Sequence, residues 1–517
     1  MLADELADHY GNSKRILVIE AGSYLLPTHS YNVGRFSNAD VAKRFGSRTF
    51  WQFGSGDPHG RENYIHEELQ LNLGGRSIFW SGLIPTIQPW ELAFFPQAVR
   101  NDLTSTYLKQ AGSKLNQSVS MGKTAQAIVN KLRSTNLVND FIIEQTPRAL
   151  HQPYLNPTGV AVEETYIEPT GVFNTAELLI NQLGLPGNRD QNQGGLFLLL
   201  NHYVEDIIPN HNGDYRLVVK DVINDHYKDL YGRKVILAAG SIGSPKLLAR
   251  STVGQGLPQD SKNLIGRGLT DHPTTDWVET EVTHINNLKI PRNTHAKIVL
   301  YSKGLRDAQG QIKYPFNVEI NINHEYWHLR ENDPTSPQTP ISMSGPSRMD
   351  FKFSFANCLD NGNEIKQPPS FGYIPEIYFR NLHWTSHLTQ SRFPALAKWQ
   401  KSDHEVFAIL NEVSNRILSQ FNKNGQPVTR LPGFPFGKDN KDFGFGTVHH
   451  AVGTLRMPAV LSLGGTIQTS SVVDENLKLK GVDNIYVSDM SVMPFSSAAN
   501  PVKTLSALVL RLSDHIR

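Results

Sequence analysis

Three hydrophobic patterns follow one another along the chain, and two of them occur within its first 22 residues. Leu2, Leu6 and Tyr10 recur at the spacing of a helical turn, which predicts an amphipathic helix. Residues 15–22, RILVIEAG, are a short apolar run that ends in a carboxylate and a glycine, as is typical of a buried parallel strand. A helix followed by such a strand is the second half of a βαβ unit.

The third pattern is a strict alternation of apolar and polar residues in the middle of the chain. It covers residues 316–323, FNVEININ, and residues 351–355, FKFSF. Alternation predicts half-buried strands, which are usually antiparallel. After these strands we expect one long helix with an apolar face formed by Val406, Leu410, Val413, Ile417 and Phe421.

The α/β pattern occurs again on both sides of this region. Residues 235–239 are predicted as a buried strand, residues 240–243 as a small-residue turn, and Ser244 and Pro245 as the N-cap and first residue of a helix. Near the C-terminus the pattern predicts a strand over residues 484–488. A helix follows, with a buried face formed by Val502, Leu505, Leu508, Leu512 and Ile516.

Two Pro- and Gly-rich segments interrupt these patterns and are predicted to be loops. They cover residues 331–347 and 425–437. The first is long enough to form a lid over a site, although a surface loop is the commoner meaning of such a segment.

Composition describes an ordinary globular chain. It has 517 residues, 39% of them hydrophobic and 19% charged, and a net charge of +2. Lysine and arginine are scattered without a basic run, which argues against a nucleic-acid partner. The single cysteine, Cys358, excludes an internal disulfide. We see no membrane span and no export signal, and we expect a cytoplasmic protein.

Two adjacent histidines are the first candidates for chemistry. They lie in TVHHAVGTLRMP, residues 447–458, before a Gly-Thr turn. A neutral imidazole can accept a proton near physiological pH, so one histidine is a candidate general base. The alternative is that both are structural residues bonded to loop carbonyls.

The start of the last predicted helix is the second candidate. Asn500 and Pro501 suit an N-cap and a first helical residue. The same helix start directs free N–H groups and the positive end of the helix dipole forward, where they would stabilise an anion formed during a reaction.

Glycines suggest two further places where backbone approaches a ligand. Residues 71–85, LNLGGRSIFWSGLIP, combine a glycine pair with small and aromatic residues, which lets backbone come close to a flat or charged group. Residues 263–273, NLIGRGLTDHP, could direct glycine amides at a phosphate, although by composition they are an ordinary turn-rich loop.

Together these stretches resemble the glucose-methanol-choline (GMC) family of flavoenzymes over most of the chain. Each motif is weak alone, but four in the family order are highly specific. The matching segments are ILVIEAG at 16–22, AAGSIGSPKLLARSTVG at 238–254, NLIGRGLTDH at 263–272, and HHAVGTLRM at 449–457 followed by VSDMSVMPFSSAANP at 487–501.

The resemblance implies an α/β plus α+β fold, in which a Rossmann-like FAD-binding domain is interwoven with a substrate domain built on an antiparallel sheet with helices. The FAD-binding domain would comprise residues 1–90, 195–275 and 446–517. The substrate domain would comprise residues 91–194 and 276–445.

It also implies the roles of individual residues. The family spacing of histidine to Gly-Thr selects His450, rather than His449, as the base, with Asn500 as its hydrogen-bond partner. Phe79 replaces a histidine that carries the flavin covalently in pyranose oxidase, so we expect FAD to bind noncovalently. The expected cofactor contacts are Glu20, Gly74, Gly75, Ser77, Ser81, Gly240, Ser241, Asp489 and Pro501.

The segment GGRSIFW, residues 74–80, is similar to the pyranose-oxidase-like branch of the family. This resemblance implies oxidation of a hydroxyl group of a sugar or related alcohol. The electron acceptor would be oxygen, a quinone or a redox protein, and relatives in the branch suggest a homo-oligomer.

One family element does not occur where it is expected. Glu20 suits the acid that bonds the ribose, but only 19 residues precede it and the first ten contain no glycine. A phosphate-binding loop would lie about 20 residues before that acid. The intact helix and strand favour a late start codon or a truncated gene copy over a naturally flavin-free relative.

Two alternative functions therefore stay open. One is a flavin-free, inactive family member that lost its cofactor together with the first strand. The other is a non-redox lyase on the same fold, because some family members are hydroxynitrile lyases.

Overall fold

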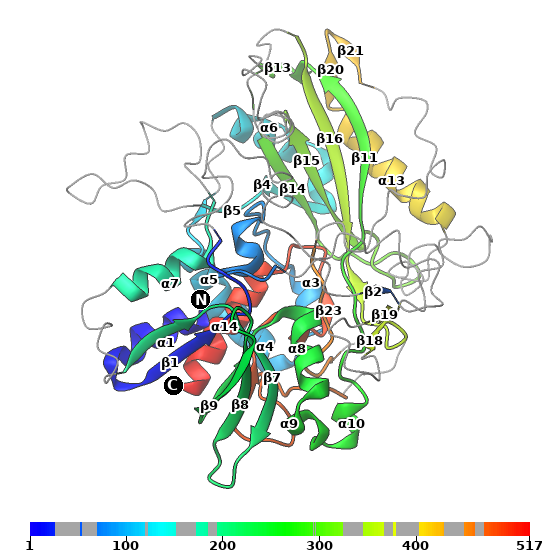
Figure 1. Ribbon diagram of the computed structural model, residues 1–517. Coiled ribbons are helices and arrows are strands. Elements are labelled where there is room, and N and C mark those ends of the chain that lie inside the picture. Colours follow the sequence, from blue (N-terminus) through cyan, green and yellow to red (C-terminus); the bar gives the residue numbers. More distant parts are fainter. Residues whose placement is uncertain are drawn as a thin grey trace.

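A five-stranded sheet and a body of helices with parallel strands form the two parts of the molecule, above and below one another in Figure 1. The computed structural model describes residues 1–25, 52–53, 70–118, 123–150, 172–184, 194–292, 294, 296–323, 345–366, 376–378, 403–428, 449–460 and 470–517. Most of the two segments predicted as loops, 331–347 and 425–437, lies outside these residues.

The upper sheet is antiparallel throughout, with the strand order β11-β16-β15-β14-β4. Its strands are β4 (Phe141–Gln145), β11 (Thr274–Val282), β14 (Ala296–Ser302), β15 (Phe316–Ile322) and β16 (Ser347–Phe355). The two alternating segments of the sequence are thus neighbouring strands, with Ile320 opposite Phe351. The predicted antiparallel pairing is confirmed.

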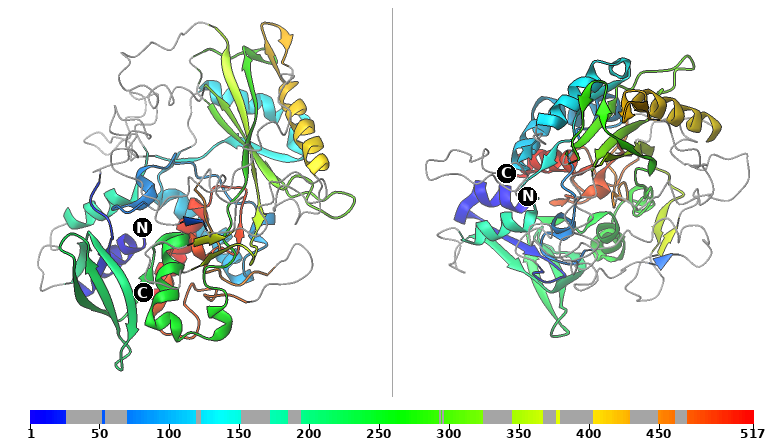
Figure 2. Two further views of the ribbon diagram at one scale, coloured as in Figure 1. Left: turned by 45° about the vertical axis from the view of Figure 1, so that its right-hand side comes forward. Right: turned by 90° about the horizontal axis from the view of Figure 1, so that it is seen from above.

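One face of this sheet forms the main hydrophobic core with helices α6 (Lys123–Arg133) and α13 (Asp403–Leu418), which cover it in both views of Figure 2. The prediction that β15 is half-buried is wrong. Asn317 and Asn321, on its polar side, are each only 4% exposed. Their amides find partners there: Asn317 Oδ1 accepts the Ser302 N–H at 3.1 Å, and Asn321 Nδ2 donates to Asp350 at 2.7 Å. The polar side is therefore covered as well.

Helix α13 confirms the predicted apolar stripe except at its end. Val406, Leu410, Val413 and Ile417 are buried in the core, but the helix ends at Leu418. Phe421 enters the same core from strand β20 (Phe421–Lys423). Hydrophobic spacing alone does not distinguish a helix from a strand that follows it and packs against the same core.

Two pairs of parallel strands lie in the lower part, in addition to the short parallel pair of β2 (Gln52–Phe53) and β19 (Glu376–Tyr378). Strand β1 (Arg15–Ile19) pairs with β6 (Gly195–Leu199), and β10 (Val235–Leu237) pairs with β22 (Ile485–Val487). Among the described residues the two pairs are separate sheets. The prediction that β1 is a buried strand is therefore wrong: within this part of the chain it is paired on one side only, and Leu17 is 45% exposed.

Helix α8 (Gly240–Arg250) begins five residues before Pro245, its predicted first residue. Pro245 lies inside the helix and has no N–H for the carbonyl of Ser241. The Thr454 hydroxyl donates to that carbonyl instead, at 2.7 Å. A contact from a distant segment thus replaces the lost helical bond.

Helix α14 (Val502–Ile516) lies at the centre of the lower part and packs on α5 (Leu108–Lys114) and α1 (Leu2–Tyr10) (Figure 1). Its predicted buried residues Leu508, Leu512 and Ile516 are in the second core. The expected cap is displaced by one residue, because Pro501 rather than Asn500 occupies the N-cap position. The Asn500 side chain is thus not needed to cap the helix.

Shorter elements complete the described fold, and an antiparallel meander of β7, β8 and β9 follows the first parallel pair. The meander strands are β7 (His202–Pro209), β8 (Tyr215–Asp221) and β9 (His226–Gly232). Short elements near the site or the sheet are the 3₁₀ turn η3 (Gly75–Ile78), α3 (Pro89–Leu92), η5 (Asn136–Asn139), α7 (Thr175–Gly184), η7 (Met490–Val492) and β23 (Phe495–Ser496). The remaining elements are the 3₁₀ turn η1 (Gly11–Ser13), α4 (Gln97–Asp102), a π-helical turn (Leu103–Tyr107), β2 (Gln52–Phe53), β3 (Gln117–Ser118), β5 (Arg148–Ala149), α9 (Thr252–Gln255), α10 (Gln259–Lys262), β12 (His284–Ile285), β13 (Leu288–Lys289), β17 (Asn357–Cys358), β18 (Glu364–Lys366), β19 (Glu376–Tyr378) and β21 (Gln426–Pro427). Of the helices in the described ranges, none has the length and apolar character to cross a membrane.

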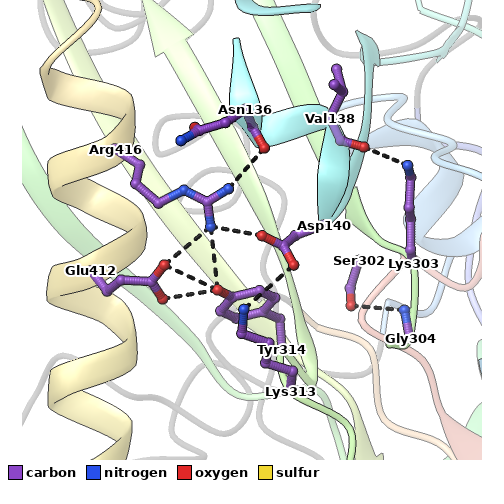
Figure 3. A network of polar contacts seen from close by, with 10 residues as sticks. All are labelled: Asn136, Val138, Asp140, Ser302, Lys303, Gly304, Lys313, Tyr314, Glu412 and Arg416. Carbon is purple, nitrogen blue, oxygen red and sulfur yellow. Dashed lines mark hydrogen bonds and ion pairs between the residues drawn. The ribbon is translucent and has the colours of Figure 1, made fainter. Parts of the chain in front are cut away.

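A polar network fastens α13 to the rest of the sheet domain (Figure 3). Arg416 of α13 donates to Asp140 at 2.8 Å, to Glu412 at 3.1 Å and to the backbone oxygen of Asn136 at 3.1 Å. The Tyr314 hydroxyl also bonds Glu412, at 2.9 Å. Because the side chains of Arg416 and Asp140 are only 18% and 11% exposed, water compensates poorly for a lost partner.

We predict that Arg416→Met lowers the free energy of unfolding by about 2 kcal/mol, because Asp140 loses its main cation in a poorly hydrated site. Urea unfolding followed by circular dichroism measures the change. Arg216→Met is the matched control: its ion pair with Asp229 is nearly 40% exposed and contributes about 0.5 kcal/mol or less. Equal urea midpoints for the two variants would contradict the prediction.

Candidate active site

Three segments that are distant in sequence are joined by backbone hydrogen bonds where the two parts of the molecule meet. Residues 266–273 and 449–457 pair through Thr270 and Val452, whose N–H and carbonyl groups bond at 3.2 and 2.9 Å. Residues 449–457 in turn bond the third segment, 488–498, where the Leu455 N–H donates to the Ser491 carbonyl at 2.9 Å. The motifs of the sequence are thereby brought into one place.

This arrangement brings His450 against His272, which directly precedes β11. The Nε2 atom of His272 lies 2.5 Å from Nδ1 of His450, and the ring centroids are 4.7 Å apart. His272 is 1% exposed and His450 is half-buried. The two imidazoles therefore share a hydrogen bond in a poorly hydrated place.

The direction of the bond between the two imidazoles is determined by the other nitrogen of His272, Nδ1. Nδ1 of His272 lies 3.3 Å from the carbonyl oxygen of Ala498, which can only accept, so Nδ1 carries the proton. In a neutral ring Nε2 of His272 is then an acceptor, and Nδ1 of His450 donates to it. A neutral His450 consequently has an unprotonated Nε2, as a base requires.

Electrostatics keep both rings neutral. Burial lowers the pKa of His272 to about 3, and the nearby Lys352 contributes in the same direction. Burial, together with the positive charges that His272, His449, Lys352 and Arg76 carry when protonated, holds the pKa of His450 well below its ordinary value.

Asp271 lies beside the pair and is fully buried. Its carboxylate accepts the backbone N–H of His272 at 2.7 Å, and with the two imidazoles it forms a set that could surround a cation. Two nitrogen ligands on one tetrahedral zinc ion would be roughly 3.3 Å apart. The observed 2.5 Å is instead the distance of a shared proton.

The segment that ends at Asn500 runs beside the histidine pair. Ala498 provides the carbonyl for His272, and Asn500 follows two residues later as a half-buried residue. Pro501 is buried and begins the turn into α14, where the Leu505 N–H bonds its carbonyl at 2.8 Å. The start of α14 is thus close in sequence to a direct contact of the pair.

Ser241 and Asp489 bond the backbone of segments next to the histidine pair. The Ser241 hydroxyl donates to the carbonyl of Ala451, next to His450, at 2.6 Å. The Asp489 carboxylate accepts the N–H of Gly240 at 3.0 Å and that of Ser491 at 2.9 Å, and it also accepts the Ser244 hydroxyl. These side chains connect α8 to residues 449–457 and 488–498, with protein donors already satisfying the carboxylate of Asp489.

The glycine pair before η3 has two different environments. Gly74 has a φ of +86°, and a Cβ there would lie 3.0 Å from that of Ala176, so it is needed for packing on α7. A Cβ on Gly75 would meet no atom within 4 Å. Ser77 is held by the Gly74 carbonyl at 2.6 Å and the Thr175 N–H at 3.0 Å, whereas Ser81 is exposed.

The loop 263–273 does not offer the glycine amides that the sequence suggested for a phosphate. The Gly266 N–H donates to Thr454 at 2.9 Å, and the Gly268 N–H donates to Asn363 at 2.8 Å. Protein carbonyls therefore occupy these donors, because the loop must pair its buried backbone with its neighbours. Within this motif, the residue that contacts His450 is His272, to which the motif alone assigned no role.

Glu20 lies at the end of β1, in the other parallel pair. Its Oε1 accepts the N–H of Gly22 at 2.8 Å, and burial raises its pKa to about 7. A carboxylate in this position has a second oxygen for a hydroxyl donor, as a ribose-binding acid requires.

At the start of α8, a Cβ on Gly240 would meet no atom within 4 Å, as at Gly75. Gly75 and Gly240 thus leave open space in front of the backbone, which suits a flat ligand.

Comparison with known sequences places these motifs in one family. Residues 188–274 match the N-terminal profile of GMC oxidoreductases, and residues 397–508 match their C-terminal profile. The chain is 25% identical to pyranose dehydrogenase 3 of Leucoagaricus meleagris over 354 residues, which are 61% of this chain and 56% of that protein. It is 45% identical to the neither inactivation nor afterpotential protein G of Drosophila melanogaster over 53 residues, 10% of this chain and 9% of that protein.

Solved structures share the fold. Pyridoxine 4-oxidase from Mesorbium loti aligns over 99% of this chain and 96% of its own, with a TM-score of 0.60 and 17% identity. A variant of Aspergillus oryzae formate oxidase aligns over 100% and 95%, with a TM-score of 0.60 and 13% identity.

In these two regions, residues 188–274 and 397–508, the chain is similar to the GMC oxidoreductase family. The family and the α/β plus α+β fold class predicted from the sequence are thereby confirmed. The chain spans less than two thirds of the length of the two curated relatives that it matches, 9% of one and 56% of the other.

We predict that Glu20→Gln removes a pH-dependent loss of stability. A carboxyl whose folded pKa is raised stabilises the fold fully below its unfolded pKa of about 4.5, and this contribution is lost as the pH rises through about 7. At pH 8 the variant should be about 1–2 kcal/mol more stable than the wild type, with half-burial taken into account. Urea unfolding without added flavin, at pH 4.5 and 8, measures this. A similar gain at pH 8 for Asp260→Asn, at an exposed site, would contradict the assignment.

Proposed function

We propose that this chain is an FAD-dependent oxidoreductase that oxidises a hydroxyl group of a sugar or related alcohol. The observation that carries the proposal is the His272–His450 pair, in which the hydrogen-bond directions leave Nε2 of His450 unprotonated. Similarity to the GMC family supports the reaction class, and the similarity to a pyranose dehydrogenase supports a sugar as substrate.

FAD, when bound, supplies the acceptor for the hydride that leaves the carbinol carbon. Glu20 would bond the ribose, and the open backbone at Gly75 and Gly240 would face the ring system. Gly74, Ser77, Ser241 and Asp489 would shape these turns, and Ser81 and Pro501 would border the ring. Phe79 offers no nucleophile, which supports noncovalent binding.

His450 acts as the base for the substrate hydroxyl. Its Nε2 takes the hydroxyl proton, and its Nδ1–H stays bonded to His272, so the ring keeps its orientation when it becomes charged. Both rings start neutral because burial disfavours their protonation. The base is therefore in its active form throughout the neutral pH range.

Asn500 donates a second hydrogen bond to the substrate oxygen. Its side chain is not used to cap α14, and it is half-buried beside the segment that contacts His272. A neutral amide donor stabilises negative charge that develops on this oxygen as the proton leaves. The N-terminus of α14 adds a positive dipole end at the same place.

A flavin-free binding protein is the second candidate function. The observation that favours it is the separation of the two parallel strand pairs among the described residues, because a dinucleotide normally binds at the edge of a continuous parallel sheet. An absorption spectrum of the protein mixed with FAD and then desalted separates the candidates: a retained flavin band supports the oxidoreductase, and a colourless folded protein supports the alternative.

We predict that His450→Ala lowers the rate of substrate-driven flavin reduction by about 10²- to 10⁴-fold, the usual contribution of a general base, while FAD stays bound. Anaerobic mixing of the FAD-loaded protein with sugars, followed by the bleaching of the flavin band, measures the rate. Oxygen, a quinone and a redox protein are then tested as acceptors.

His211→Ala is the matched control, because His211 is exposed on a hairpin turn and should leave the rate unchanged. An unaltered reduction rate in His450→Ala would contradict the assigned base. Bleaching by no alcohol, in a protein that retains FAD, would favour a lyase.

A further inference from the structure

Building on the proposed function, we propose that Glu91 is a positioning residue for the histidine pair. Its carboxylate holds the peptide group between Ala498 and Ala499 and thereby fixes the proton positions on His272 and His450. Glu91 lies on α3, far in sequence from these residues, and touches neither imidazole directly.

Glu91 is fully buried, and its two oxygens serve different elements. Oε2 accepts the backbone N–H of Gln88 at 2.9 Å, which completes the capping box of α3. Oε1 accepts the N–H of Ala498 at 2.6 Å, across a separation of 407 residues. The N–H of Ala499 also donates to this carboxylate. Capping a four-residue helix accounts for one oxygen only, so the other contacts call for a second role.

The peptide group between Ala498 and Ala499 connects Glu91 to the site. Its N–H donates to Glu91, and its carbonyl oxygen accepts the Nδ1–H of His272 at 3.3 Å. Hydrogen bonds in series polarise one another, so a negative charge at the N–H end makes the carbonyl a better acceptor. This favours the tautomer of His272 with a proton on Nδ1, which in turn leaves Nε2 of His450 unprotonated.

The surroundings of Glu91 allow it to titrate near neutrality. Burial raises its pKa to about 7, although three backbone donors oppose the shift. Tyr301 of the sheet is its ionisable neighbour, and Glu144 lies on Tyr301 in turn. The groups around the histidines are Asp271, Lys352, Glu319, Arg76 and His449.

The ionisation state of Glu91 determines how activity changes with pH. Above pH 7 the ionised carboxylate accepts all three N–H groups and holds the peptide. Below pH 7 the neutral carboxyl loses acceptor strength, so activity should rise with pH through about 7. The histidines titrate far lower and cannot produce this change.

We predict that Glu91→Gln lowers the plateau rate of flavin reduction on the order of tenfold, the effect typical of a group that orients a functional imidazole, and abolishes the change near pH 7. Stopped-flow reduction from pH 5.5 to 8.5 measures both. Glu144→Gln is the matched control, since this carboxyl is near Tyr301 but contacts neither Ala498 nor Ala499. It should keep the plateau and the change near pH 7. A wild-type profile that is flat near pH 7, or a change that persists in Glu91→Gln, would overturn the proposal.

A second measurement needs no activity. Nitrogen-15 NMR of histidine-labelled protein without flavin reports the tautomers, with the two signals assigned by their loss in His272→Asn and His450→Asn. The wild type should show Nδ1–H on both rings, and Glu91→Gln should mix the tautomers. An Nε2–H tautomer of His272 in the wild type would overturn the proposal even if no variant folds. A wild type that shows both Nδ1–H signals but is never reduced by alcohols would refute the proposed function while supporting the role of Glu91.

Discussion

The pairing of buried backbone groups among residues 266–273, 449–457 and 488–498 is the constraint on which the site depends. Each segment is largely irregular, so many of its N–H and carbonyl groups need partners from outside the segment. They find them in one another, as in the bonds between Thr270 and Val452 and between Leu455 and Ser491. The requirement that buried polar groups be bonded therefore brings His272, His450 and Ala498 into contact.

Low hydration gives this arrangement its chemistry. Burial keeps both imidazoles neutral, and a neutral imidazole has one donor and one acceptor nitrogen. The carbonyl of Ala498 then determines the proton on His272, and His272 determines that on His450. A backbone acceptor thus sets the state of a nitrogen two hydrogen bonds away. Supporting residues such as Ser241 and Asp489 keep this geometry by tying α8 to the same segments.

Several structural elements were predictable because they depend on local pattern. The alternation in β15 and β16, the stripe of α13 and the buried face of α14 each reflect one surface packed against one core. The failures occurred where tertiary contacts replaced local ones. Helix α8 begins before its predicted start because Thr454 bonds the carbonyl of Ser241, which Pro245 cannot bond. Phe421 lies in a strand after α13, not in the helix, and packs on the same core.

The sequence by itself determined the resemblance to the family, the fold class and the identity of His450 and Asn500 as candidates, because family motifs and hydrophobic periods are local patterns of consecutive residues. Only the tertiary structure decided that His272 is the partner of His450, that the glycine amides of residues 266 and 268 are already bonded, and that Glu91 reaches Ala498. These contacts join residues 178 to 407 positions apart or depend on which backbone groups are buried. Local sequence patterns predict neither these distant contacts nor the burial of these backbone groups.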